Sequence, residues 1–245
     1  MKKTPGQNLT NTLRNSHLHY WVCRILEKFE MEGFTLSYSQ CGEDLILKSI
    51  FGKNNRQGFY VDIGCNNPIQ KSNTFKLYLR GWTGICVDGN SVLIDHFRKI
   101  RKKDICLTAI VSNSSREIVF YQDDVNHEMS SVDVEQANEL KSTNTDLKEI
   151  RTFSTTLKDL FEKHLDSRKI DLLCVDVERH DLQVLQGNDF EKYRPSIVCA
   201  ECNGNIDTLR GSEMDTFLRE KNYELLIFAA PNAYYRDKAL SVGLS

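Results

Sequence analysis

Short apolar runs alternate along the chain with segments in which apolar residues recur at three-and-four spacing. The apolar runs predict strands at 59–63, 83–87, 105–111, 170–175 and 196–200. The periodic segments predict helices at 43–51, 74–80, 92–100, 157–164, 182–187 and 213–221. This alternation is typical of an α/β fold in which a parallel sheet carries helices on both faces.

The C-terminal part of the pattern differs, because two apolar runs at 223–228 and 233–236 are joined by a Pro-Asn turn. Two strands this close in sequence form a hairpin, so one of them must run antiparallel to its neighbours. We therefore expect a Rossmann-like methyltransferase fold, with a mostly parallel seven-stranded sheet that contains one antiparallel C-terminal hairpin strand. A further short strand is expected at 117–121.

Residues 1–35 form a separate N-terminal part. After a polar start at 1–15, residues 17–31 predict an amphipathic helix. Its apolar face is made of Leu18, Trp21, Val22, Ile25, Leu26 and Phe29. We expect this face to pack on the rest of the protein as a cap.

Residues 36–245 are expected to form one Rossmann-like domain, as a chain of 245 residues allows. Within it, residues 122–151 are polar and contain few large apolar side chains. An insertion of this length in a compact domain is usually a lid or a mobile loop. The polar side chains that suit a lid over an acceptor are His127, Glu128, Ser130 and Ser131.

The charge of the chain argues against two classes of partner. A net charge of −2 offers no field that recruits nucleic acid or an anionic membrane. The basic run at 98–103 is typical of cations gathered at a helix C-terminus, although a phosphate or lipid patch has the same composition. Glu27, Glu30 and Glu32 disfavour attachment of the first helix to an anionic surface. We therefore expect neither nucleic acid nor a membrane as a partner.

The cysteines and the N-terminus indicate a cytoplasmic protein. Most of the eight cysteines lie in apolar runs, where they behave as small buried hydrophobic residues, and the chain does not resemble a disulfide scaffold. Cys199 and Cys202 form a lone C-x-x-C without a second ligand pair, which disfavours a zinc or redox site. A polar stretch, not an apolar one, follows the basic start, and no run is long enough to span a membrane.

The ends of the first two strands suit the binding of an adenosyl cofactor. The first strand leads into Asp62, Gly64 and Asn66, in a loop that faces the ligand crevice of an open α/β sheet. Of the glycine pattern that cradles a dinucleotide pyrophosphate, only Gly64 is present. S-adenosylmethionine has no phosphates; Asp62 can meet its ammonium and loop amides can meet its carboxylate. Asp88, at the end of the second strand, can accept both ribose hydroxyls.

Each acid also has a plainer interpretation. Asp62 could be satisfied by loop amides, and Asp88 could cap the next helix. Acids at the ends of two consecutive strands nevertheless favour a shared ligand. Asp104 and Ala109, around the third strand, are candidates for the adenine side.

Polar residues also follow the next two strands, beside the expected position of the methyl group. The predicted catalytic residues are Asp176, Glu178 and His180 after one strand and Glu201 after the other. An alcohol acceptor needs alignment and a general base, and His180 or Glu178 could serve.

The same strand ends could instead hold a metal ion. Asp176, Glu178, Glu201 and Asn203 would supply four oxygen ligands of the kind that Mg²⁺ prefers, and the ion would acidify a hydroxyl. A third interpretation is that Glu178 or Asp181 caps the following helix.

Five motifs are distributed over residues 36–236. They are Tyr38-Ser39-Gln40-x-Gly42-Glu43-Asp44, Gly58-Phe59-Tyr60-Val61-Asp62-Ile63-Gly64, Ser72-Asn73-Thr74, Arg80-Gly81-Trp82-x-Gly84-Ile85 and Ile170-Asp171-Leu172-Leu173-Cys174-Val175-Asp176-Val177-Glu178-x-His180. Together they resemble the FkbM-type family of S-adenosylmethionine-dependent methyltransferases. The resemblance implies S-adenosylmethionine as methyl donor and commonly O-methylation, often of sugars or polyketide-type natural products. It also implies that Ser72 and Asn73 belong to the cofactor-binding set, with a small-molecule or glycan-linked hydroxyl as acceptor.

Several positions depart from the family's pattern. Arg179 stands where glycine is usual, Asp181 stands where glutamate is usual, and Cys65, Asn66 and Asn67 replace small residues or histidines. Because Arg179 lies beside the predicted chemistry, a catalytically inactive cofactor-binding or scaffold protein of the same fold is an alternative. A nicotinamide-dependent oxidoreductase would have the same sheet pattern, but the absence of the glycines that bind a pyrophosphate disfavours it.

Overall fold

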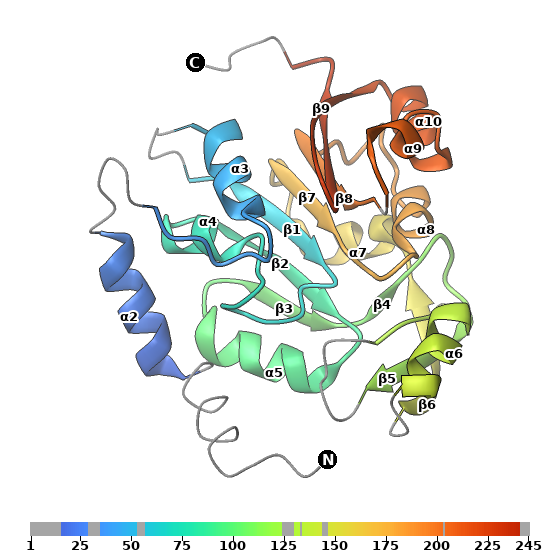
Figure 1. The fold of residues 1–245 in the computed structure, drawn as a ribbon, viewed down its shortest axis with the longest axis horizontal. Helices are drawn as coiled ribbons and strands as arrows, with labels where there is room; N and C mark the ends of the chain where they lie inside the picture. Colours follow the sequence, from blue (N-terminus) through green and yellow to red (C-terminus); the bar gives the residue numbers. More distant parts are fainter. Residues whose placement is uncertain are drawn as a thin grey trace.

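The computed structural model describes residues 16–28, 35–52, 57–123, 130–132, 134–143, 147–202 and 204–240. A seven-stranded sheet with the strand order β3-β2-β1-β7-β8-β10-β9 forms its centre (Figure 1). The strands are β1 (Phe59–Ile63), β2 (Thr83–Asp88), β3 (Ile105–Thr108), β7 (Leu172–Val175), β8 (Ile197–Glu201), β9 (Tyr223–Ala229) and β10 (Asn232–Asp237). β10 runs antiparallel to both β8 and β9, whereas the pairs among β3, β2, β1, β7 and β8 are parallel. This confirms the predicted Rossmann-like sheet with its antiparallel hairpin strand.

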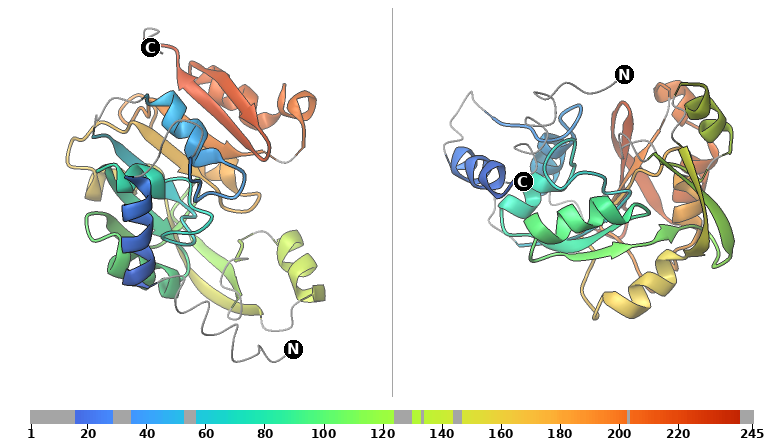
Figure 2. Two further views of the ribbon diagram at one scale, coloured as in Figure 1. Left: turned by 60° about the vertical axis from the view of Figure 1, so that its left-hand side comes forward. Right: turned by 90° about the horizontal axis from the view of Figure 1, so that it is seen from below.

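Helices cover both faces of this sheet (Figure 2). One face carries α2 (His17–Glu27), α3 (Glu43–Ile50), α4 (Phe75–Leu79) and α5 (Ser91–Ile100). The other carries α7 (Leu157–His164), α8 (Asp181–Gln186), α9 (Ile206–Leu209) and α10 (Glu213–Glu220). The central strands are buried on both sides: Val61 and Ile63 of β1 enter one core, while Tyr60 enters the other. Continuous apolar runs in the sequence follow from this two-sided burial.

A small second sheet has the strand order β4-β6-β5, and its strands β5 and β6 contain the two ends of the predicted insertion. It is made of β4 (Ile110–Val111), β5 (Glu117–Asp123) and β6 (Leu147–Thr155), and α6 (Val134–Thr143) precedes β6. The strand predicted at 105–111 is therefore two strands, divided at Ala109 and shared between the two sheets. The stretch 122–151 is not only a loop, because β6 pairs antiparallel with the whole of β5. Of its predicted lid residues, Ser130 and Ser131 are described, while His127 and Glu128 lie outside the described residues.

The N-terminal helix α2 packs on the domain, but through the face opposite to the predicted one. Cys23 is buried, and Tyr20 packs beside Phe75 and Tyr78 of α4. Five residues of the predicted apolar face are exposed, namely Leu18, Trp21, Val22, Ile25 and Leu26, and the sixth, Phe29, lies outside the described residues. The helix therefore packs on the domain as predicted, but the expectation that its apolar face makes this contact is wrong, because periodicity identifies an apolar face without saying where that face points. Within the described ranges, no helix is long and apolar enough to cross a membrane.

All eight cysteines are free, and six of them are buried. Cys86, Cys174 and Cys199 lie in one core as small hydrophobic residues. Cys202 packs instead against the core on the other side of the sheet, so the C-x-x-C pair is divided between two faces.

Candidate active site

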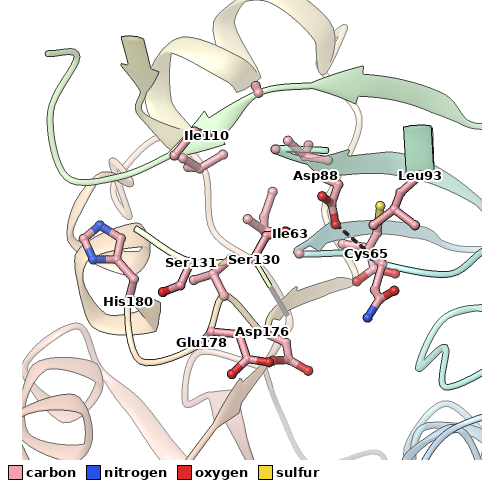
Figure 3. Close-up of a pocket in the computed structure, with 18 of the residues that line it drawn as sticks. Ile63, Cys65, Asp88, Leu93, Ile110, Ser130, Ser131, Asp176, Glu178 and His180 are labelled. Carbon is pink, nitrogen blue, oxygen red and sulfur yellow. Dashed lines mark hydrogen bonds between the residues drawn. The ribbon is translucent and has the colours of Figure 1, made fainter. Parts of the chain in front are cut away.

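A pocket of about 310 Å³ opens beyond the carboxyl ends of β1, β2 and β7 (Figure 3). This is the place where the strand order reverses on either side of β1, and where open α/β sheets bind their ligands. The pocket brings together all seven residues predicted for cofactor binding, Asp62, Gly64, Asn66, Ser72, Asn73, Asp88 and Ala109. From the predicted catalytic set it adds Asp176, Glu178 and His180.

Two other candidates do not line the pocket, and a third, Asn203, lies outside the described residues. Glu201 ends β8 nearby, outside the lining. Asp104 precedes β3 and therefore stands at the opposite edge of the sheet. There it accepts hydrogen bonds from the Tyr60 hydroxyl at 2.6 Å and the Gly84 amide at 2.9 Å. The prediction that Asp104 contributes to the adenine side is therefore wrong.

Gly64 allows the two halves of the pocket to meet. Its φ is 79°, in the left-handed region that favours glycine. A Cβ atom there would lie 1.8 Å from the carbonyl oxygen of Asp176, so any side chain would force the loops apart. The amide of Asp176 donates to the Ile63 carbonyl at 3.0 Å, which fixes the same approach.

Asp88 is held between two backbone amides. One carboxylate oxygen accepts from the Asn90 amide at 2.8 Å. The other accepts from the Asn66 amide at 3.1 Å (Figure 3). Loss of hydration raises the pKa of Asp88 to about 6, although both hydrogen bonds oppose the rise. Asp88 is not the cap of α5; Asn90 has that role, and its side chain accepts from the Val92 amide. The carboxylate is thus fixed in the pocket wall without serving as the helix cap.

Asp62 is supported from behind by Thr74 and Arg101. The Thr74 hydroxyl donates to the Asp62 carboxylate at 2.6 Å, and Arg101 donates to the same hydroxyl at 2.7 Å. Burial raises the pKa of Asp62, while the charge of Arg101 and the hydrogen bond from Thr74 oppose the rise. The hydroxyl of Thr74 thus takes the place of the loop amides that the plainer interpretation expected.

Arg101 is a residue of the site region that the sequence interpretation missed. It belongs to the basic run at 98–103, yet its side chain is fully buried. It donates to the Pro68 carbonyl at 2.8 Å and to the Ser72 hydroxyl at 2.5 Å, in addition to Thr74. Its position in the helix could have indicated this burial. Arg101 follows the buried Phe97 by four residues and so continues the buried face of α5.

Asp176 and Glu178 lie side by side at the other end of the pocket (Figure 3). Loss of hydration, followed by the negative charges of Glu201 and Glu178, raises the pKa of Asp176 to about 7. His180 is turned toward the small sheet, where its Nε2 lies 2.9 Å from the Ser112 hydroxyl. A carboxyl group that titrates near neutrality in a pocket is a candidate acid or base.

The turn after Asp176 contains two consecutive residues in the left-handed region, Glu178 at φ 57° and Arg179 at φ 70°. The resemblance expects glycine at the second of these positions, and the backbone explains why. Arg179 is exposed and pairs with Glu139 of α6 at 3.1 Å, which connects the turn to the insertion. Asp181, the other departure, is buried and accepts from the Val177 amide at 3.4 Å within the same turn.

Arg179→Gly is expected to raise the free energy of unfolding by about 0.5–1 kcal/mol, because glycine relieves a left-handed conformation worth about 1–2 kcal/mol and loses only an exposed ion pair. Urea denaturation measures the change. Glu139→Gln removes the ion pair alone and should alter stability by less than about 1 kcal/mol. A destabilised Arg179→Gly variant would show that the arginine side chain stabilises the turn.

The motif at 38–44 brings Gln40 to the pocket wall, a second contribution that sequence reasoning did not assign. The buried Asp44 organises this motif, because its carboxylate accepts from Ser37, Ser39 and the Tyr38 amide. Lys71, Ser130, Ser131 and Val132 are further lining residues. The three from the insertion meet the pocket because the Ser131 and Tyr121 backbones pair with each other.

The predicted magnesium site is not supported. Among the described residues, no three His, Cys, Asp or Glu side chains are close enough together to hold a metal ion. Asp176 and Glu178 line the pocket while Glu201 stays outside the lining.

Comparison with known proteins identifies the family. A family model described as the methyltransferase FkbM domain matches residues 62–225, which run from the end of β1 through β8 into β9. No curated protein matches the chain. The match covers well over half of the sequence and agrees with the motifs, the sheet order and the position of the pocket. The chain belongs to the FkbM methyltransferase family.

Proposed function

We propose that this methyltransferase uses S-adenosylmethionine and transfers the methyl group to a hydroxyl of a sugar, a glycan or a small natural product. The observation that carries the proposal is that one pocket contains Asp62 and Asp88 on one side and Asp176 on the other. Its volume of about 310 Å³ is within the range of small-molecule sites.

The cofactor side fits an adenosyl group without phosphates. The Asp88 carboxylate keeps lone pairs for ribose hydroxyls beyond its two amide contacts, and Asp62 offers negative charge for an ammonium. Asn66 supports this fit, because its side-chain oxygen is buried with no hydrogen-bond partner among the described residues. When bound, S-adenosylmethionine supplies an activated methyl group on a sulfonium, and the protein must supply alignment and proton removal.

The acceptor side fits a neutral hydroxyl compound. Asp176, with a pKa of about 7, can accept the proton of the hydroxyl. Loss of hydration, together with the charges of Glu201 and Glu178, keeps that pKa high. Ser130 and Ser131 add hydroxyl groups that can orient a polar acceptor. Four carboxylates and one lysine line the pocket, a charge balance that disfavours nucleic acid or another polyanion.

The two alternatives receive less support. A nicotinamide-dependent oxidoreductase lacks its glycine pattern and also disagrees with the family match. An inactive scaffold was suggested by Arg179, but that side chain is exposed and paired with Glu139, and it does not line the pocket. For location, the eight free cysteines suit a reducing compartment, and we propose the cytoplasm.

S-adenosylhomocysteine at 100 times its dissociation constant is expected to stabilise the protein by about 2.7 kcal/mol. For a domain of this size, that corresponds to roughly 5–10 °C in a thermal unfolding experiment. Asp88→Asn should lose most of the shift, whereas Asp95→Asn, at an exposed acid of α5, should keep it. No shift at saturating S-adenosylhomocysteine, or a shift with NAD alone, would reject the proposed cofactor.

A further inference from the structure

The exposed apolar face of α2 is the clearest surface feature outside the pocket. Among the described residues, seven large apolar side chains are exposed, and five of them belong to this helix. They are Leu18, Trp21, Val22, Ile25 and Leu26, with exposed fractions between 42% and 64%. Their spacing of three and four places them on one stripe, called here the α2 stripe. A contiguous apolar patch on a protein surface marks an interaction site.

The outward direction of the α2 stripe is fixed by contacts on the other side of the helix. The ring of Tyr20 lies 6.4 Å from Phe75 and 6.3 Å from Tyr78, and Cys23 is buried. Glu27 forms an ion pair with the fully buried Lys76 at 3.1 Å. Rotating the stripe inward would break this ion pair and expose Cys23, so the stripe is a stable feature of the surface.

The rim of the α2 stripe is basic. Glu27 is the one acidic residue within α2, and it faces inward toward Lys76 and Arg80. Arg24 and Lys28 are exposed, and the Arg24 guanidinium lies 5.4 Å from the Trp21 ring. Glu27 is therefore neutralised on the inner side of α2 and does not repel an anionic surface.

The C-terminal end of α5 adds further cations beside α2. Tyr78 connects the two helices, because its ring packs near Tyr20 and its hydroxyl donates to the Ile100 carbonyl at 3.4 Å. The exposed basic residues around this end are Arg98, Lys99, Lys102 and Lys103. Figures 1 and 2 show α2 and this end of α5 on the side of the molecule away from α6, β5 and β6.

We propose that α2 is a membrane-docking helix, which seats the α2 stripe in the interface of an anionic lipid surface. A tryptophan and aliphatic side chains on one face, flanked by lysine and arginine, have the chemistry of an interfacial helix. The cations beside them complement the negative charge of phospholipid headgroups. A second copy of the chain fits less well, because a stable interface takes about 800 Å² from each partner, and about three turns of one helix do not offer that area.

The test is flotation of the full-length protein with two kinds of vesicle. One kind is pure phosphatidylcholine, and the other contains about one third phosphatidylserine. The protein is expected to float with the anionic vesicles and to bind them at least about tenfold more tightly than the neutral ones. Arg24→Gln combined with Lys28→Gln should weaken the anionic binding by about 10–30-fold, since each cation near the surface contributes about 1 kcal/mol.

A fluorescence experiment reports on the stripe itself. The chain has two tryptophans, of which Trp21 is exposed and Trp82 is buried. In a Trp82→Phe variant, Trp21 is the single reporter, and its emission should shift to shorter wavelength when anionic vesicles are added. The flotation of the unmodified protein provides the same test if this variant folds poorly.

Matched variants distinguish vesicle binding through the α2 stripe from non-specific hydrophobic binding. Trp21→Ser combined with Ile25→Ser should lose vesicle binding at an unchanged unfolding temperature, because both side chains are exposed. Phe153→Ser removes an apolar side chain of β6 that is 75% exposed, and binding should persist. Absence of binding to anionic vesicles, or equal loss in the Phe153 variant, would overturn the proposal. So would a dimer in solution that the α2 stripe variant dissociates.

Discussion

Asp176→Asn is expected to slow methyl transfer by about 10²–10⁴-fold, the range that a general base contributes. The amide has nearly the shape of the carboxylate but cannot accept the acceptor's proton. Asp176 stands where the cofactor side and the acceptor side meet, with its carbonyl against Gly64 and its carboxyl beside Glu178. Single-turnover transfer to an accepted hydroxyl compound measures the loss. S-adenosylhomocysteine binding should remain, because Asp62 and Asp88 are untouched.

The pH dependence of the reaction identifies the base. With a pKa of about 7, Asp176 is protonated in mildly acid solution, so the rate should rise as the pH increases through 7. Glu178→Gln removes one of the negative charges that raise this pKa, and the rise should move to lower pH. Glu162→Gln, at an exposed acid of α7, should leave the profile unchanged. If the pH profile of Glu178→Gln is unshifted, Asp176 is not the base, and another residue such as His180 has that role.

The stability of the Asp176→Asn variant separates catalysis from folding. The pKa of Asp176 is higher in the folded protein than the usual value near 3.9 of an unfolded chain. The folded state therefore binds the proton more tightly, and the stability contributed by this group falls as the pH rises from about 4 to 7. Above pH 7 the charge of Asp176 still faces the charges of Glu201 and Glu178, a repulsion that asparagine removes. The variant should consequently be slow in methyl transfer yet at least as stable as the unmodified protein at pH 8.

The sequence predicts the main sheet well because its strands are buried on both faces. β1 and α7 begin and end at the predicted residues. The error at Ala109 has a physical origin: apolar residues continue from β3 into β4, but the partner of β4 is β6, about 40 residues later. A local pattern contains no information about that partner, and the polar composition of 122–151 hides the pairing of β5 with β6.

The sequence predicts those residues of the candidate site that directly follow the parallel strands. Asp62, Asp88 and Asp176 follow parallel strands, and the carboxyl ends of such strands share one edge. Gln40 and Ser131 reach the same pocket from regions outside the parallel strands, and no spacing rule connects them to it. Arg101 is hidden by its neighbours, because four exposed cations surround the one that is buried.

Because Arg101 is buried, it can hold several parts of the site together, which the neighbouring surface cations cannot do. Its guanidinium connects Pro68, Ser72 and Thr74, so one side chain fixes the loop between β1 and α4 and the hydroxyl that supports Asp62. It also lies 3.9 Å from Asp104 and over the ring of Phe97 at 4.9 Å. The planar fork of arginine serves these separate acceptors at once, a geometry that lysine does not offer.

Arg101→Met is expected to lower the free energy of unfolding by about 3–5 kcal/mol, because it leaves the buried Asp62 and Asp104 carboxyls without their counter-charge. Arg101→Lys keeps the charge but loses the fork, and should recover only part of the stability. Arg98→Met, at an exposed position of the same helix, should change stability by less than about 1 kcal/mol. Urea denaturation gives all three values, and equal stability of the Arg98 and Arg101 variants would contradict a central role for the buried cation. Since Ser72 and Asp62 lose their support together, S-adenosylhomocysteine should also bind Arg101→Met more weakly at temperatures where the variant is still folded.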